Sequence, residues 1–136
     1  MIHLDTSLLV DLLRETARGK AGPATRLLDT IQDEDLWISV CVACELHAGA
    51  ELSTRPAQER QRVERLCSGL HIAYPDESFP PAYGRLLAWQ QRRGERISTM
   101  DLLIATAAIV AGAPLATRNV KDFSRVPGLE LLRYSS

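Results

Sequence analysis

Met1-Ile2-His3-Leu4-Asp5-Thr6-Ser7 opens the chain as a short apolar run that ends on a carboxylate. The leucines that follow repeat at helical spacing: Leu8, Leu9, Leu12 and Leu13. This segment therefore predicts a buried strand that gives way to a helix, with Thr6 or Ser7 as a cap. Acidic side chains are rarely fully buried unless they are paired or bind a metal. In open α/β sheets, ligands bind at the carboxyl ends of strands, so Asp5 is the first candidate site residue.

Short apolar runs alternate with helical patterns along the rest of the chain. Strands are predicted at residues 2–4, 36–40, 70–73, 115–117 and 129–132. After the leucine-rich helix, a second helix is predicted from Pro23, and others at 41–52, 55–66, 80–93 and 99–111. This alternation predicts a mostly parallel sheet covered by helices on both faces, an α/β/α sandwich. No linker or internal repeat interrupts it, so we expect one domain over residues 1–136.

The composition is that of an ordinary globular chain of 136 residues, 46% hydrophobic, with a net charge of -1. This balance neither indicates nor excludes nucleic-acid binding, because charge can be segregated locally. No apolar run approaches the roughly 20 residues of a membrane span, and we expect neither membrane association nor a secretion signal. Three cysteines form no even framework, which favours a reducing, cytoplasmic compartment.

Further polar side chains fall at positions that correspond to Asp5. Glu45 lies about one turn into the helix after the second strand, and Asp101 in the first turn of the helix near Thr99. Asn119 and Asp122 follow the fourth strand. Because the ends of parallel strands share one side of a sheet, we expect these residues to meet in one cleft. Converging carboxylates favour a hard divalent cation such as Mg²⁺, which supports phosphodiester hydrolysis.

Each of these residues also has a simpler interpretation. Asp5 can cap the first helix, and Glu45 can be a solvated helix residue. Asp101 fits a capping pattern with the serine three residues before it. Asn119 and Asp122 fit a turn. No single residue is specific, and the joint placement is what favours a site.

Four segments resemble the motifs of PIN domains, in the same order along the chain. They are Ile2-His3-Leu4-Asp5-Thr6-Ser7, then Ile38-Ser39 with Ala43-Cys44-Glu45-Leu46 and Gly49, then Asp101-Leu102-Leu103-Ile104-Ala105-Thr106-Ala107, and last Ala116-Thr117-Arg118-Asn119-Val120-Lys121-Asp122-Phe123 followed by Val126-Pro127-Gly128-Leu129. Their order and spacing resemble those of VapC toxins from bacterial toxin–antitoxin pairs, over essentially the whole chain. The resemblance implies a Mg²⁺- or Mn²⁺-dependent endoribonuclease that cleaves RNA, often tRNA, and so halts translation.

The same resemblance assigns roles to individual residues. Asp5 and Asp101 are implied as the main metal ligands, with Glu45 completing the acidic site directly or through water. The family's fourth acidic position falls on Asn119, and this neutral amide weakens the case for a second metal ion. Asp122 is a candidate to compensate. Thr6 also resembles a polar residue near the metal or substrate, and the family implies a homodimer neutralised by a VapB-type antitoxin.

Basic side chains near the predicted cleft are candidates for contacts with RNA phosphates. They are Arg92, Arg93 and Arg96, before the helix that carries Asp101, and Arg118 and Lys121, beside the fourth strand.

Two other functions compete with the ribonuclease interpretation. Cys41-Val42-Ala43-Cys44 lies between a predicted strand and helix, which is the context of a thiol redox motif. The rest of the chain lacks the short βαβ opening expected around such a motif, so these cysteines also fit as small core residues. A catalytically silent PIN-like module that only binds RNA or a partner is the second alternative. His3 is expected to pack within the first strand.

Overall fold

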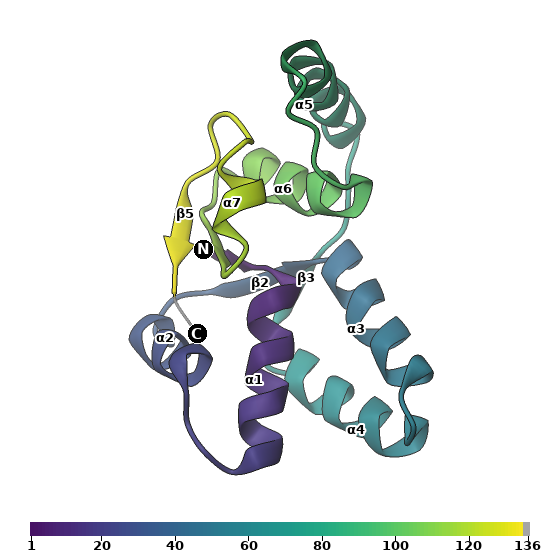
Figure 1. Ribbon diagram of the computed structural model, residues 1–136, viewed down its shortest axis with the longest axis vertical. Coiled ribbons are helices and arrows are strands. Elements are labelled where there is room, and N and C mark those ends of the chain that lie inside the picture. Colours follow the sequence, from purple (N-terminus) through teal and green to yellow (C-terminus); the bar gives the residue numbers. More distant parts are fainter. Residues whose placement is uncertain (135–136) are drawn as a thin grey trace.

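Five short parallel strands form the central sheet of the computed structural model, which describes residues 1–134 (Figure 1). They are β1 (Ile2–Leu4), β2 (Leu36–Ser39), β3 (His71–Ala73), β4 (Leu115–Thr117) and β5 (Leu131–Arg133). The strand order is β3-β2-β1-β4-β5, and every pairing is parallel. His3 of β1 lies level with Trp37 on one side and Leu115 on the other. The first strand is therefore the centre of the sheet, and Asp5 follows its carboxyl end.

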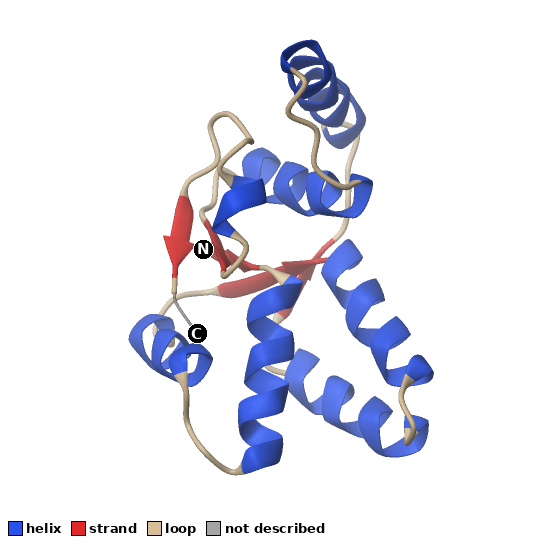
Figure 2. Cartoon of the chain, viewed as in Figure 1, coloured by secondary structure: helices blue, strands red, loops and turns tan. Residues whose placement is uncertain are grey.

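Helices cover both faces of this sheet (Figure 2). They are α1 (Thr6–Arg18), α2 (Pro23–Ile31), α3 (Val40–Leu52), α4 (Pro56–Cys67), α5 (Phe79–Arg93), α6 (Thr99–Ala111) and α7 (Val120–Phe123). In the view of Figure 1, α1 to α4 lie on one side of the sheet and α5 to α7 on the other. The predicted α/β/α sandwich with a parallel sheet is confirmed. Within residues 1–134, no helix combines the length and the apolar character needed to cross a lipid bilayer.

Several element boundaries differ from the sequence-based expectation: β3 begins at His71, α4 covers Pro56–Cys67 and α5 begins at Phe79, each one residue from the expected position. Val40 was expected to end a strand but begins α3, because the Ser39 hydroxyl accepts the Val42 N–H and starts the helix one residue early. The segment after β4 was expected to be a turn and forms the single helical turn α7. The last strand covers Leu131–Arg133, not residues 129–132. The sequence patterns locate each element well but its ends less well.

His3 packs within β1 as expected, with 1% of its surface exposed. Its ring stacks on Trp37, which stacks on His71, at centroid distances of 6.5 and 4.7 Å. These three side chains share one register across three neighbouring strands. Burial, helped by the nearby N-terminal charge, lowers the pKa of His3, so the neutral ring is favoured in the folded state. The stacked rings pack three neighbouring strands together, and His3 therefore has a structural role in the sheet.

A buried carboxylate fixes the start of α2. Glu15 of α1 accepts hydrogen bonds from the backbone N–H groups of Gly22, Ala24 and Thr25 and from the Thr25 hydroxyl, at 2.7 to 3.0 Å. Burial alone would raise the pKa of Glu15, but these hydrogen bonds outweigh it and lower the pKa to about 2. The first N–H groups of a helix lack partners within it, and Glu15 supplies them from another helix.

Glu15→Gln should lower the free energy of unfolding by about 1–3 kcal/mol at neutral pH, because an amide nitrogen replaces one accepting oxygen. Since the folded-state pKa lies below the ordinary value of 4.5, the unfolded chain binds more protons between these values. The stability that Glu15 contributes is present above about pH 4.5 and is lost as the pH falls towards about 2. Urea unfolding at several pH values, with the exposed Glu130→Gln as control, measures both effects. An unchanged pH profile in Glu15→Gln would contradict the assignment.

Candidate active site

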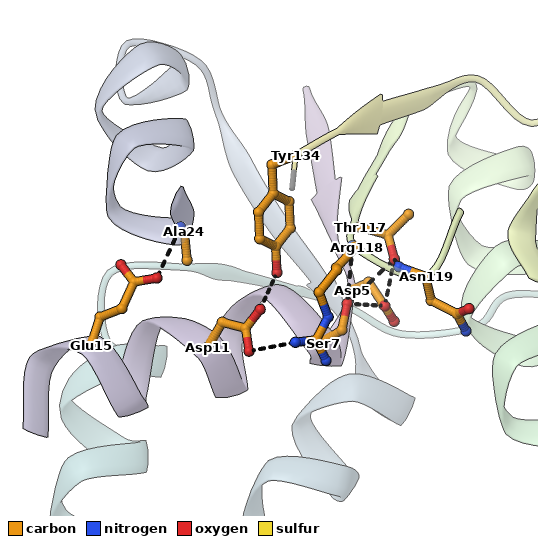
Figure 3. Close-up of polar contacts among 9 residues, drawn as sticks. All are labelled: Asp5, Ser7, Asp11, Glu15, Ala24, Thr117, Arg118, Asn119 and Tyr134. Atoms are coloured by element: carbon orange, nitrogen blue, oxygen red, sulfur yellow. Dashed lines mark hydrogen bonds and ion pairs between the residues drawn. The ribbon is translucent and has the colours of Figure 1, made fainter. Parts of the chain in front are cut away.

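Asp5 lies directly after β1 and is buried, with 3% of its surface exposed. It occupies the N-cap position of α1, but its side chain makes no capping hydrogen bond. Its Oδ2 instead accepts the hydroxyls of Ser7 at 2.7 Å and Thr117 at 2.8 Å (Figure 3). Within residues 1–134, none of the ion pairs involves Asp5. The simple helix-cap interpretation of Asp5 is therefore excluded, and two neutral hydroxyls fix the orientation of this carboxylate.

Glu45 lies in the second turn of α3 and is half-buried. Its Oε1 accepts the hydroxyl of Thr6 at 2.6 Å. Thr6 is the residue after Asp5 and the first residue of α1. This hydrogen bond ties Glu45 to the Asp5 end of the sheet, so Glu45 is more than a solvated helix residue.

Asp101 lies in the first turn of α6, where its N–H donates to the Ser98 hydroxyl at 3.2 Å. The capping pattern is confirmed, and it coexists with a second feature. Burial raises the pKa of Asp101, a hydrogen bond with Ser98 opposes this rise, and the charges of Asp5, Glu45 and Asp122 add to it. Asp5, Glu45 and Asp122 therefore lie close enough to Asp101 for their charges to act on it, as expected for the carboxyl edge of the sheet.

Asn119 and Asp122 are paired with each other beside this edge. The Asn119 side-chain amide donates to Asp122 Oδ2 at 3.3 Å, and the Asn119 N–H donates to the Thr117 hydroxyl at 2.9 Å. Both residues thus hold the start of α7, which agrees with the turn-stabilising interpretation. Among residues 1–134, no group of three or more His, Cys, Asp or Glu side chains is placed to hold a metal ion by itself.

Known proteins are similar to this chain in sequence and in fold. A family model described as PIN domain matches residues 2–129. The chain belongs to the PIN domain family. It is similar to Ribonuclease VapC1 of Haemophilus influenzae strain R2866, with 30% identity over 127 residues that cover 93% of this chain and 92% of that protein. The tRNA(fMet)-specific endonuclease VapC of Salmonella typhimurium strain LT2 is 31% identical over 96 residues, or 71% of this chain and 73% of that protein. The crystal structure of VapBC2 from Rickettsia felis, bound to a DNA fragment from their promoter, contains a similar chain with a TM-score of 0.90 and 28% identity; the match covers 99% of this chain and 100% of that one.

The basic residues predicted to contact RNA differ from one another in their contacts and in their exposure. Arg118 directly follows β4, and its Nη1 donates to Asp11 Oδ1 at 3.1 Å. Arg93 lies over the Trp89 ring, 4.3 Å from its centroid, at the end of α5, which extends away from the sheet (Figure 1). The others are exposed: Arg92, Arg96 and Lys121. Arg118 is the member of this set with hydrogen bonds that reach the Asp5 region, and contacts with RNA by the whole set stay a prediction.

Sequence reasoning missed the residues that orient Asp5. Ser7 and Thr117 stand in the PIN-like motifs, but Ser7 was expected only as a candidate helix cap and Thr117 had no predicted role. Thr117 is completely buried at the end of β4 and bonds both Asp5 and Asn119. A hydroxyl residue at the end of the strand beside Asp5 is a recognisable signal only once the strand order is known.

Cys41 and Cys44 are free thiols one helical turn apart in α3. Burial raises the pKa of Cys41, and the neighbouring Cys44 and Glu45 raise it further. A thiol redox site needs a lowered pKa, because the thiolate is the reactive form. The redox alternative is therefore not favoured.

Proposed function

We propose that this chain is a metal-dependent endoribonuclease and the toxin of a toxin–antitoxin pair. The observation that carries the proposal is the convergence of the charges of Asp5, Glu45 and Asp122 on Asp101, at the carboxyl edge of a parallel sheet. Acids that gather without basic partners suit a divalent cation. The similarity to proteins named VapC ribonucleases supports the same conclusion.

The residues present fit a magnesium ion. Magnesium prefers oxygen ligands, keeps several waters and is commonly held by one or two carboxylates. The absence of a three-residue ligand group within residues 1–134 is therefore compatible with it. We assign Asp5 and Asp101 as the ligands, with Glu45 completing the site directly or through water. Mn²⁺ shares this preference for oxygen ligands and is an expected substitute.

The chain's own residues divide the work at this site. Ser7 and Thr117 hold the Asp5 carboxylate in one orientation, and Thr6 holds that of Glu45. A bound magnesium ion would activate water and offset charge on the RNA phosphate. The neutral amide of Asn119 donates to Asp122, so fewer carboxylate oxygens are free here to bind a second ion.

The proposed substrate is RNA, and tRNA is the first class to test, because one relative is named a tRNA(fMet)-specific endonuclease. The proposed partner is a VapB-type antitoxin, because a similar chain was solved within VapBC2. A homodimer is part of the same proposal.

The test of this function is cleavage of bacterial tRNA by the purified chain, with the ends of the products mapped by sequencing. We expect cleavage at a small number of discrete positions. The double substitution Cys41→Ser and Cys44→Ser should leave the rate within about twofold, since these side chains have no role in phosphodiester hydrolysis. Loss of cleavage in that variant would favour the thiol alternative, and RNA binding without cleavage would favour the silent module.

A further inference from the structure

Asp11 connects three parts of the chain that are distant in sequence. It lies on α1, with its side chain 12% exposed. One carboxylate oxygen accepts from Arg118 Nη1 at 3.1 Å, and the other accepts from the Tyr134 hydroxyl at 2.9 Å (Figure 3). Burial and the hydrogen bond to Asp11 raise the pKa of Tyr134 above its usual range, so the phenol keeps its proton and donates it to this bond. Each carboxylate oxygen of Asp11 therefore accepts a hydrogen bond.

This cluster is attached to the candidate active site. Arg118 directly follows Thr117, whose hydroxyl donates to Asp5. The Arg118 backbone N–H donates to the Ser7 hydroxyl at 3.3 Å, and Ser7 in turn donates to Asp5. Arg118 and Tyr134 each follow the carboxyl end of a parallel strand, as Asp5 does. Figure 3 shows the Arg118 side chain running beside Ser7 towards Asp11.

The guanidinium of Arg118 is anchored at one end and partly open to solvent. Its side chain is 42% exposed, and its side-chain hydrogen bonds within residues 1–134 use Nη1 alone. A guanidinium carries five N–H donors in a planar fork that matches phosphate oxygens. Anchoring one edge leaves the other donors in a defined direction and lowers the entropy cost of binding.

We propose that Arg118 binds a phosphate of the RNA beside the scissile bond, and that Asp11 and Tyr134 are positioning residues that aim its guanidinium. This inference rests on the proposed ribonuclease function and adds a substrate-binding device to it. Asp11 is negative and would repel RNA if it acted through its charge alone. Positioning and simple electrostatics therefore predict opposite effects when Asp11 is removed.

The experiment measures the Kd for a fluorescein-labelled tRNA transcript in EDTA, and KM and kcat for tRNA cleavage with magnesium. Asp11→Ala should raise Kd and KM about fivefold, and Tyr134→Phe about threefold, while kcat stays within about twofold. Asp11→Glu should restore most of the affinity. Arg118→Ala should weaken binding about tenfold and reduce the salt dependence by about one phosphate contact, whereas Asp11→Ala should keep that dependence.

Asp33→Ala is the matched control, because it makes the same charge change at an exposed position. Asp33 precedes β2 and so lies towards the amino ends of the strands, away from the candidate site. Circular dichroism checks that each variant is folded, and Tyr134→Phe keeps the test available if Asp11→Ala is not. Tighter or unchanged RNA binding in both folded variants would overturn the inference and leave the ribonuclease function standing. If the unsubstituted chain neither binds nor cleaves tRNA, the proposed function fails and this inference fails with it.

Discussion

Asp5→Asn is expected to lower kcat for RNA cleavage about a thousandfold or more, the loss typical of removing a charged group that holds a catalytic ion. The asparagine side chain has the same shape, and because both hydroxyls donate to the same oxygen of Asp5, the asparagine carbonyl oxygen placed there can still accept both. The fold should therefore survive, at a cost of about 1 kcal/mol, because hydrogen bonds to a neutral acceptor are weaker than those to a carboxylate.

The matched control for this variant is Asp33→Asn, which removes one negative charge far from the site. Cleavage rates, thermal unfolding and circular dichroism of both variants separate a lost ligand from a lost fold. Cleavage by Asp5→Asn at the rate of the control would remove Asp5 from the mechanism.

Asp101→Asn should abolish cleavage to a similar extent and yet make the metal-free chain more stable. The pKa of Asp101 is raised by burial and by the charges of Asp5, Glu45 and Asp122, which means that its charged form is disfavoured in the folded state. Removing that charge should increase the free energy of unfolding by up to about 1 kcal/mol, after allowance for solvent screening at this half-buried position. Lower stability combined with normal activity would contradict both parts of the expectation. Stability gained at the expense of activity is the usual trade-off at strained catalytic sites.

Urea unfolding in EDTA measures the stability change, and the same protein samples give the cleavage rates with magnesium. Asp33→Asn again controls for the general effect of one lost charge, because it is exposed and carries no hydrogen bond from its side chain within residues 1–134.

The fold follows from local patterns, which is why the sequence predicts it well. Short apolar runs and amphipathic segments alternate along the chain. Residues that start and stop helices mark the boundaries, such as Ser98 before α6 and Gly112 after it. Boundaries such as that at Ser39 depend on which hydroxyl captures a backbone N–H, and a periodic pattern does not contain that information.

The acidic site was predictable because sheet topology places strand ends together. Asp5, Glu45 and Asp101 needed only the assumption of a parallel sheet to be grouped. Their roles as ligands stay a prediction. The partners that orient them were not predictable in the same way, because Thr117 and Asp5 are 112 positions apart and meet only through the pairing of β1 with β4.

The contacts of Asp11 with Arg118 and Tyr134 were equally hard to predict from the sequence, for the same reason. Tyr134 lies 123 positions from Asp11 and reaches it only because β5 follows β4 at the edge of the sheet. Glu15, in contrast, accepts hydrogen bonds from residues only seven to ten positions away. Even so, neither composition nor helical spacing indicates that this glutamate is buried.

The magnesium dependence of tRNA cleavage tests the central claim most directly. The purified chain is treated with EDTA and dialysed, and the initial rate of tRNA cleavage is measured before and after magnesium chloride is added. We predict no cleavage above background without the ion and full recovery on its addition, with no recovery in Asp5→Asn. Undiminished cleavage by the metal-free chain would contradict the assignment of Asp5 and Asp101 as metal ligands.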